Sequence, residues 1–309
     1  MADVPTASET PGHAFAPEMA ALRERINAWI GKCDPELRAE LEWQFLAGSK
    51  YFRPFTVFAC YHAMHATAAP PPDVVESAML IELFHNVSLI IDDIVDKSEH
   101  RRNRLTLHTK FGELSAFMTS GYIVADGFRL AAGDPGLTEL FAELLKRLAV
   151  AECMQWRLRR QPLGVEDWRG IAGEDTGSMF EIAACLGDRT QRLRKFGGLL
   201  GLLYHGCDDV ADVRGASALG GGGVDDLRDG ILTLPAALAI RDAAIARVFV
   251  DPSEEQLPLL AQAFQAKIPE AEAYLDRIAE EARTEARLFA PYPDGLITLI
   301  NQTRQLSAR

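Results

Sequence analysis

Apolar side chains recur along most of this chain at intervals of three and four residues, the spacing that builds one face of an α-helix, and alternating strand patterns are nearly absent. The pattern predicts helices at about residues 18–31, 35–47, 54–67, 73–96, 113–131, 136–160, 165–186, 189–213, 233–248, 253–265, 268–289 and 294–305. The stretch 73–96 is apolar nearly all round, so we expect it at the centre of a helical bundle.

The chain shows no linker and no shift of composition that would divide it. Residues 1–17 combine prolines with neither a basic start nor an apolar core, which predicts a disordered tail and not a signal peptide. Residues 18–309 are expected to form one all-α domain. The glycine run at 219–224 predicts a mobile loop, placed where a lid over a substrate would lie. The apolar stretch 78–91 is too short to span a bilayer, so no stable membrane insertion is expected.

Two acidic triplets with identical spacing each end a long apolar helix, and their residues are Asp92, Asp93, Asp96, Asp208, Asp209 and Asp212. A helix C-terminus disfavours carboxylates, so a cation should compensate them. The first and last aspartate of each triplet share one helix face. Carboxylate oxygens suit Mg²⁺, which fills its remaining positions with water and substrate phosphate oxygens. The alternative is a pair of solvated surface clusters, which the repeated spacing argues against.

Overall charge restricts the partners. The 32 Lys and Arg residues stand against 44 Asp and Glu residues, a net charge of −12 that argues against nucleic-acid binding and against an anionic membrane surface. The five cysteines are scattered and are expected to be reduced core residues. We expect a cytoplasmic protein that gathers positive charge locally if it handles anionic substrates.

Basic residues accompany the first triplet. His85 lies seven residues before the first aspartate, on the same helical stripe, and could donate to a phosphate or be a satisfied core histidine. Arg101 and Arg102 follow the triplet, and guanidinium groups bind phosphate through two donors at once. Lys50 and Arg53 lie at a predicted helix start, a position that favours anions.

These motifs resemble the trans-prenyl diphosphate synthase, or polyprenyl synthetase, family over about residues 45–240. Stretch 48–54 is similar to its Gly-Gly-Lys-x-x-Arg-Pro pattern, and 226–235 to its Asp-Leu-x-x-Gly-x-x-Thr-x-Pro pattern. Residues 85–112 look most like the geranylgeranyl diphosphate synthases. The resemblance implies an isoprenoid synthase helical bundle around a central active-site cavity, and a homodimer.

The resemblance also implies an activity, the Mg²⁺-dependent condensation of isopentenyl diphosphate with an allylic prenyl diphosphate. Magnesium on the two triplets would hold the allylic diphosphate, with further contacts from Arg101 and Thr176. The resemblance assigns the binding of isopentenyl diphosphate to Lys50, Arg53, His85 and Arg102. The departing pyrophosphate would take the proton.

The chain departs from the family pattern where three lysines usually face the allylic diphosphate, since these positions hold Asp175, Gly221 and Ile231. A glutamine usually found before the second triplet is His205. Each lost charged contact to phosphate is worth roughly 1.5–3 kcal/mol. The sequence offers two arginines as substitutes, Arg157 and Arg228.

Three hypotheses follow. The first is chain-elongating prenyl transfer. The second is a terpene synthase-like lyase. The presence of Lys50, Arg53 and Arg102 argues against it, because such an enzyme binds no second diphosphate. The third is a non-catalytic subunit of a hetero-oligomer, against which the two complete triplets argue.

Product length depends on the depth of the cavity beneath Asp92. Ser88 lies one helical turn below it and Phe84 two turns, each turn adding about 5.4 Å. In the family, an aromatic residue four or five positions before the first aspartate stops growth at fifteen carbons. This chain has Val87 and Ser88 there, so we expect geranylgeranyl diphosphate, with Phe84 as the cavity floor. The alternative is that Phe84 only packs in the core.

Overall fold

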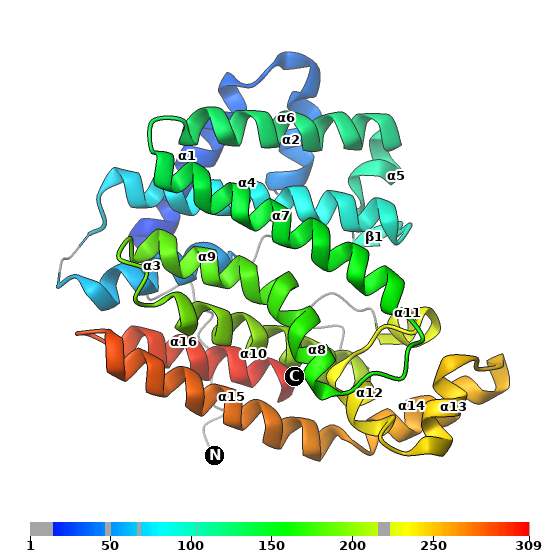
Figure 1. The fold of residues 1–309 in the computed structure, drawn as a ribbon. Helices are drawn as coiled ribbons and strands as arrows, with labels where there is room; N and C mark the ends of the chain where they lie inside the picture. Colours follow the sequence, from blue (N-terminus) through cyan, green and yellow to red (C-terminus); the bar gives the residue numbers. More distant parts are fainter. Residues whose placement is uncertain (1–14, 47–50, 67–68, 103, 216–222, 309) are drawn as a thin grey trace, which may run out of the picture.

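The computed structural model describes residues 15–46, 51–66, 69–102, 104–215 and 223–308 (Figure 1). The predictions for residues 1–14, Lys50 and Gly221 lie outside these ranges. The first half forms α1 (Ala16–Lys32), a 3-10 turn (Pro35–Leu37), α2 (Arg38–Phe45), α3 (Phe52–Met64), α4 (Pro72–Val95), β1 (His100–Arg101), β2 (Arg104–Leu105), α5 (Leu107–Phe111), α6 (Glu113–Ala131) and α7 (Pro135–Leu158).

The second half forms α8 (Val165–Ala172), a π-helical turn (Gly173–Gly177), α9 (Ser178–Gly187), α10 (Arg194–Val213), α11 (Gly223–Asp229), α12 (Leu234–Ala239), α13 (Ala243–Val250), a 3-10 turn (Glu254–Gln256), α14 (Leu257–Gln265), α15 (Ile268–Phe289), α16 (Asp294–Arg304) and a closing 3-10 turn (Gln305–Ala308). The all-α prediction is confirmed, since the described strands are only the two of one short antiparallel hairpin.

Several boundaries differ from the predicted ones. The predicted helix 165–186 contains the π-helical turn, and α10 begins at Arg194 because the Asp188 carboxylate accepts hydrogen bonds from the backbone of the preceding turn. The predicted helix 233–248 is divided, since Asp242 caps a new helix by accepting from Ala244 N. α1 begins at Ala16, inside the predicted tail. Gly223 opens α11, inside the predicted glycine loop, whose residues 219–222 are outside the described ranges.

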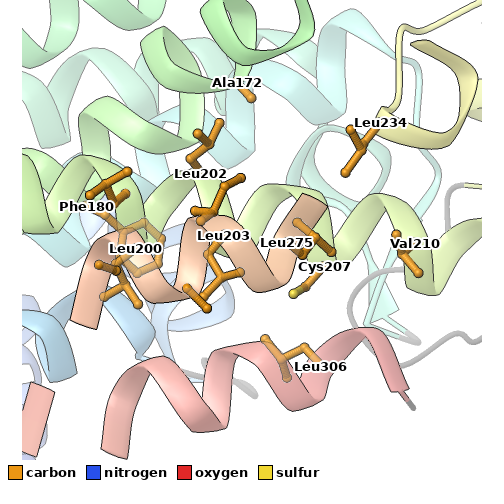
Figure 2. Packing of buried hydrophobic residues seen from close by; sticks show 14 of the residues in the cluster. Ala172, Phe180, Leu200, Leu202, Leu203, Cys207, Val210, Leu234, Leu275 and Leu306 are labelled. Atoms are coloured by element: carbon orange, nitrogen blue, oxygen red, sulfur yellow. The ribbon is translucent and has the colours of Figure 1, made fainter. Parts of the chain in front are cut away.

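Helix α4 lies at the centre, as predicted, packed against α3, α6 and α9. Its length and apolar composition would suffice for a membrane span, but 78% of its most apolar window is buried in the protein, as befits a core helix. α9 packs on α10, and α10 on α15 and α16, so the helices form successive layers (Figure 1). Figure 2 shows Leu203 and Cys207 of α10 near Leu275 of α15 and the C-terminal Leu306.

The α9–α10 contact depends on a close backbone approach. A Cβ atom on Gly197 would lie 2.5 Å from the carbonyl oxygen of Phe180 and 2.7 Å from the Cβ of Ala184. Because α10 carries the second acidic triplet, this contact sets how far that triplet lies from α4.

We predict that Gly197→Ala lowers the free energy of unfolding by about 1–3 kcal/mol, the usual cost of overpacking a core. Gly121→Ala is the matched control, because Gly121 is also helical and has no neighbour within 4 Å of a Cβ. The control should be neutral or stabilising by up to about 1 kcal/mol. Equal denaturant midpoints for the two variants would contradict the close-packing argument.

Candidate active site

The two acidic triplets lie at the ends of α4 and α10, and the middle aspartate of each is held by protein groups. Asp93 is buried and accepts a hydrogen bond of 2.8 Å from the Nε of Arg101 in β1. Burial raises the pKa of Asp93, and Arg101 opposes that rise. Asp93 therefore ties the end of α4 to the hairpin that carries the arginine pair.

Asp209 has the same kind of role at the end of α10. Its Oδ2 accepts hydrogen bonds from Trp168 Nε1 at 2.8 Å and from the backbone N of Leu234 at 2.7 Å. It thereby fixes α8 and the start of α12. The assignment of Asp93 and Asp209 to a metal stays a prediction, and their contacts favour a positioning role.

The outer aspartates face a concentration of negative charge. Burial and the nearby Glu152 and Asp175 raise the pKa of Asp92 well above its ordinary value. Burial together with Asp175 and Asp96 raises the pKa of Glu152 to about 7. Glu152 belongs to α7, and no motif in the sequence identified it as part of the site.

A similar cluster surrounds the second triplet. Burial and the charges of Asp209, Asp212 and Asp208 raise the pKa of Asp226 to about 8. Asp212, Asp226 and Ile231 line one small cavity of about 10 Å³ between α10 and α11. A lysine at position 231 would thus have faced these carboxylates.

Asp175 lies between the two clusters, on the π-helical turn. Thr176 Oγ1 donates to Asp175 Oδ2 at 3.0 Å and lies 3.0 Å from His205 Nδ1. His205 is 3.6 Å from Asp175 and 3.7 Å from Asp209. Although burial lowers it, the pKa of His205 is raised by Asp209 and Asp175. The aspartate and the histidine that depart from the family pattern are therefore partners of each other.

Two of the predicted phosphate-binding residues, Arg53 and His85, lie in contact with each other. Arg53 Nη1 lies 3.0 Å from His85 Nε2, and its guanidinium lies over the ring of Phe180. Burial, Arg53 and Arg102 lower the pKa of His85 well below its ordinary value, so His85 is neutral. Arg53 Nε and His85 Nδ1 are buried and meet no hydrogen-bond partner among the described residues. Such atoms call for a ligand.

The hairpin adds further positive charge. Arg101, Arg102 and Arg104 line a cavity of about 100 Å³ together with Asp93 and Asn86. Arg102 has a left-handed backbone, with φ of 53°. An anion entering here would meet guanidinium donors on one wall.

The residues predicted to set product length lie on α4. Ser88 is partly buried and donates to the backbone oxygen of His85, while Val87 is buried. Phe84 is fully buried, and its ring stacks on Phe141 with centroids 4.4 Å apart. It also lies across Gly127 of α6, where a Cβ would be 3.1 Å from the ring. These contacts fit both a floor and a core residue.

The donor set fits magnesium. Within the described residues, no three His, Cys, Asp or Glu side chains form a finished metal site. Mg²⁺ keeps several waters and takes substrate oxygens, so it needs only one or two carboxylates from a protein. The outer aspartates supply such oxygens, and burial with neighbouring carboxylates raises the pKa of Asp92 and of Asp226. The metal ligands themselves stay a prediction.

Comparison with known proteins identifies the family of this chain. The family model described as polyprenyl synthetase matches residues 34–267. Fold and relatives together define a prenyltransferase of the isoprenoid synthase helical fold, a polyprenyl diphosphate synthase. This chain belongs to the polyprenyl synthetase family.

Similar proteins carry different product names. A nonaprenyl diphosphate synthase of Mycobacterium tuberculosis is 26% identical, covering 92% of this chain and 91% of its own. Geranylgeranyl pyrophosphate synthase 4 of Arabidopsis thaliana is 26% identical, with 73% and 68% covered. A polyprenyl synthase of Caulobacter crescentus, complexed with calcium and isoprenyl diphosphate, superposes with a TM-score of 0.83 at 23% identity and 99% coverage of both chains.

We predict that stability without metal falls with rising pH. The pKa values of Glu152 and Asp226, about 7 and about 8, lie above their ordinary values of 4.5 and 3.8. Each group therefore stabilises the fold below its unfolded pKa and loses that contribution as the pH rises through its folded pKa. The Tm should fall between about pH 5 and pH 9, and Mg²⁺ should offset the fall.

Asp226→Asn is the control for this pH dependence, since it removes one of the two titrations. Its Tm should depend less steeply on pH. A wild-type Tm that rises over the same range would contradict the charge crowding.

Proposed function

We propose that this protein catalyses the Mg²⁺-dependent condensation of isopentenyl diphosphate with an allylic prenyl diphosphate. The observation that carries the proposal is the partly buried Arg53–His85 pair, whose Arg53 Nε and His85 Nδ1 are buried without a hydrogen-bond partner among the described residues, and a separate pair of acidic clusters. A condensation of two diphosphates needs two diphosphate-binding sites, one basic and one that binds metal. A lyase that ionises a single prenyl diphosphate needs only the acidic one.

Asp92, Asp96, Asp208 and Asp212 would hold the magnesium ions, which supply charge neutralisation of the allylic diphosphate as it leaves. Arg53, the neutral His85 and Arg102 bind and orient isopentenyl diphosphate so that its double bond faces the allylic carbon. The apolar side chains of α4 exclude water from the carbocation. The departing pyrophosphate accepts the proton, so no side-chain nucleophile is required.

The finer points belong to the same proposal. The substrates are isopentenyl diphosphate and an allylic prenyl diphosphate, the assembly is a homodimer, and the protein is cytoplasmic without stable membrane insertion. Small side chains at Val87 and Ser88 support a product of at least twenty carbons, and Phe84 supports geranylgeranyl diphosphate as the main one.

Product analysis tests the reaction itself. Purified protein is incubated with Mg²⁺ and each of dimethylallyl, geranyl, farnesyl and geranylgeranyl diphosphate, with and without isopentenyl diphosphate, and products are identified by mass spectrometry. The proposal expects longer diphosphates only when isopentenyl diphosphate is present. A hydrocarbon or alcohol formed without it would establish the lyase, and no turnover of any donor would favour a non-catalytic subunit.

We predict that Arg53→Ala raises the KM for isopentenyl diphosphate by about ten- to hundredfold, since it removes a charged phosphate contact. The KM for the allylic substrate should change much less. Arg189→Ala, which removes a surface ion pair with Asp134, is the control and should change neither constant. An equal rise in both constants for Arg53→Ala would place Arg53 outside the isopentenyl pocket.

We predict that Ser88→Phe shortens the product and Phe84→Ala lengthens it, by blocking or opening the path below Asp92. Phe45→Ala is the control, because Phe45 is also fully buried but packs against Trp29. It should lower stability without moving the product distribution. A distribution unmoved by both Ser88→Phe and Phe84→Ala would show that another helix sets the floor.

A further inference from the structure

Arg159 lies between the two acidic clusters, in the segment that follows α7. Its Nη2 donates to Asp96 Oδ1 at 3.1 Å, and its Nη1 donates to Asp229 Oδ2 at 3.1 Å. Asp96 ends α4, and Asp229 ends α11. One guanidinium thus joins the first acidic triplet to the helix that follows the second.

The neighbouring Arg160 fixes this segment in place. Its backbone N donates to Gly230 O at 2.9 Å, and its guanidinium donates to the backbone oxygens of Leu227 and Phe249. Arg160 has a left-handed backbone, with φ of 60°. Its side chain lies against Gly230, where a Cβ atom would be only 2.4 Å from Arg160 Cδ, so only glycine leaves room for it. Arg160 therefore docks the segment onto the end of α11, which orients Arg159 before any ligand arrives.

Arg159 is also shielded from water. Its side chain is 14% exposed, its guanidinium lies 3.9 Å from the ring centroid of Trp156, and its Nε is buried without a hydrogen-bond partner among the described residues. A held, desolvated guanidinium binds phosphate more strongly than a solvated one, because it loses less hydration and less side-chain freedom.

The arginines that the sequence offered as substitutes are placed less well. Arg228 is 58% exposed and reaches Glu254 at 4.0 Å. Arg157 is exposed on α7. Two of the usual lysine positions hold Asp175 and Ile231, which bring no positive charge.

We propose that Arg159 binds the diphosphate of the allylic substrate and supplies there the positive charge that this chain's departures from the lysine pattern remove. The proposal rests on the proposed function. If Asp96 bound a divalent cation, the Nη2 of Arg159 would become available to a phosphate oxygen, while Asp229 would still hold Nη1. Arg159 would then contact the substrate directly and contribute to both its binding and its ionisation.

Calorimetric titration tests this with a non-ionising probe, farnesyl thiolodiphosphate in the presence of Mg²⁺, against wild type, Arg159→Gln, Arg159→Lys and Arg157→Gln. We expect Arg159→Gln to weaken binding of the probe roughly ten- to hundredfold, the worth of a charged phosphate contact. Arg159→Lys should recover part of the loss, and Arg157→Gln should match wild type. The Kd for isopentenyl diphosphate should stay within about twofold in all four proteins.

A Kd for the probe that is unchanged or tighter in Arg159→Gln would overturn the proposal, since Arg159 would then only neutralise Asp96. Equal weakening of both ligands in Arg159→Gln and Arg159→Lys would also overturn it, as the sign of a structural role. The proposed function fails separately, if wild type binds the probe but forms no elongated product with isopentenyl diphosphate.

Discussion

Carboxylates from α4, α7, α10 and α11 crowd at one end of the bundle, and burial together with their mutual repulsion raises the pKa of several of them. Protonation or a bound cation relieves such crowding, and clusters of carboxylates with raised pKa values are common at functional sites. Neighbouring elements hold two of these carboxylates in place by hydrogen bonds. Asp93 is tied to the hairpin and Asp209 to α12, which holds the ends of α4 and α10 in place.

Positive charge is placed unevenly around that end of the bundle. Arg53 lies partly buried beside His85, where a phosphate ligand would satisfy both side chains. Asp175 occupies the position at which the family pattern noted in the sequence has a lysine, and His205 partners it. Arg159 reaches the same region from a different element. If Arg159 binds the allylic diphosphate as proposed, the segment after α7 would supply positive charge to that part of the site.

Much of this was visible in the sequence because it is local. The helical periodicity placed α4, α6 and α15 within about two residues of their bounds, and the spacing of the triplets put their outer aspartates on shared faces. The π-helical turn around Asp175 was not predicted, because it lies between α8 and α9 and the apolar spacing across all three fits one continuous α-helix. Glu152 and Arg159 were missed because each belongs to the site only through the packing of α7 against distant segments.

The central claim is that the two acidic motifs form one site for a metal-bound diphosphate. A double-mutant cycle on the Kd of Mg²⁺–pyrophosphate tests it directly, with wild type, Asp92→Asn, Asp208→Asn and the double variant measured by calorimetry. If the motifs grip one diphosphate, each single variant should lose most of the binding, and the double variant should lose little more. Losses that simply add, as for two independent sites, would contradict the account.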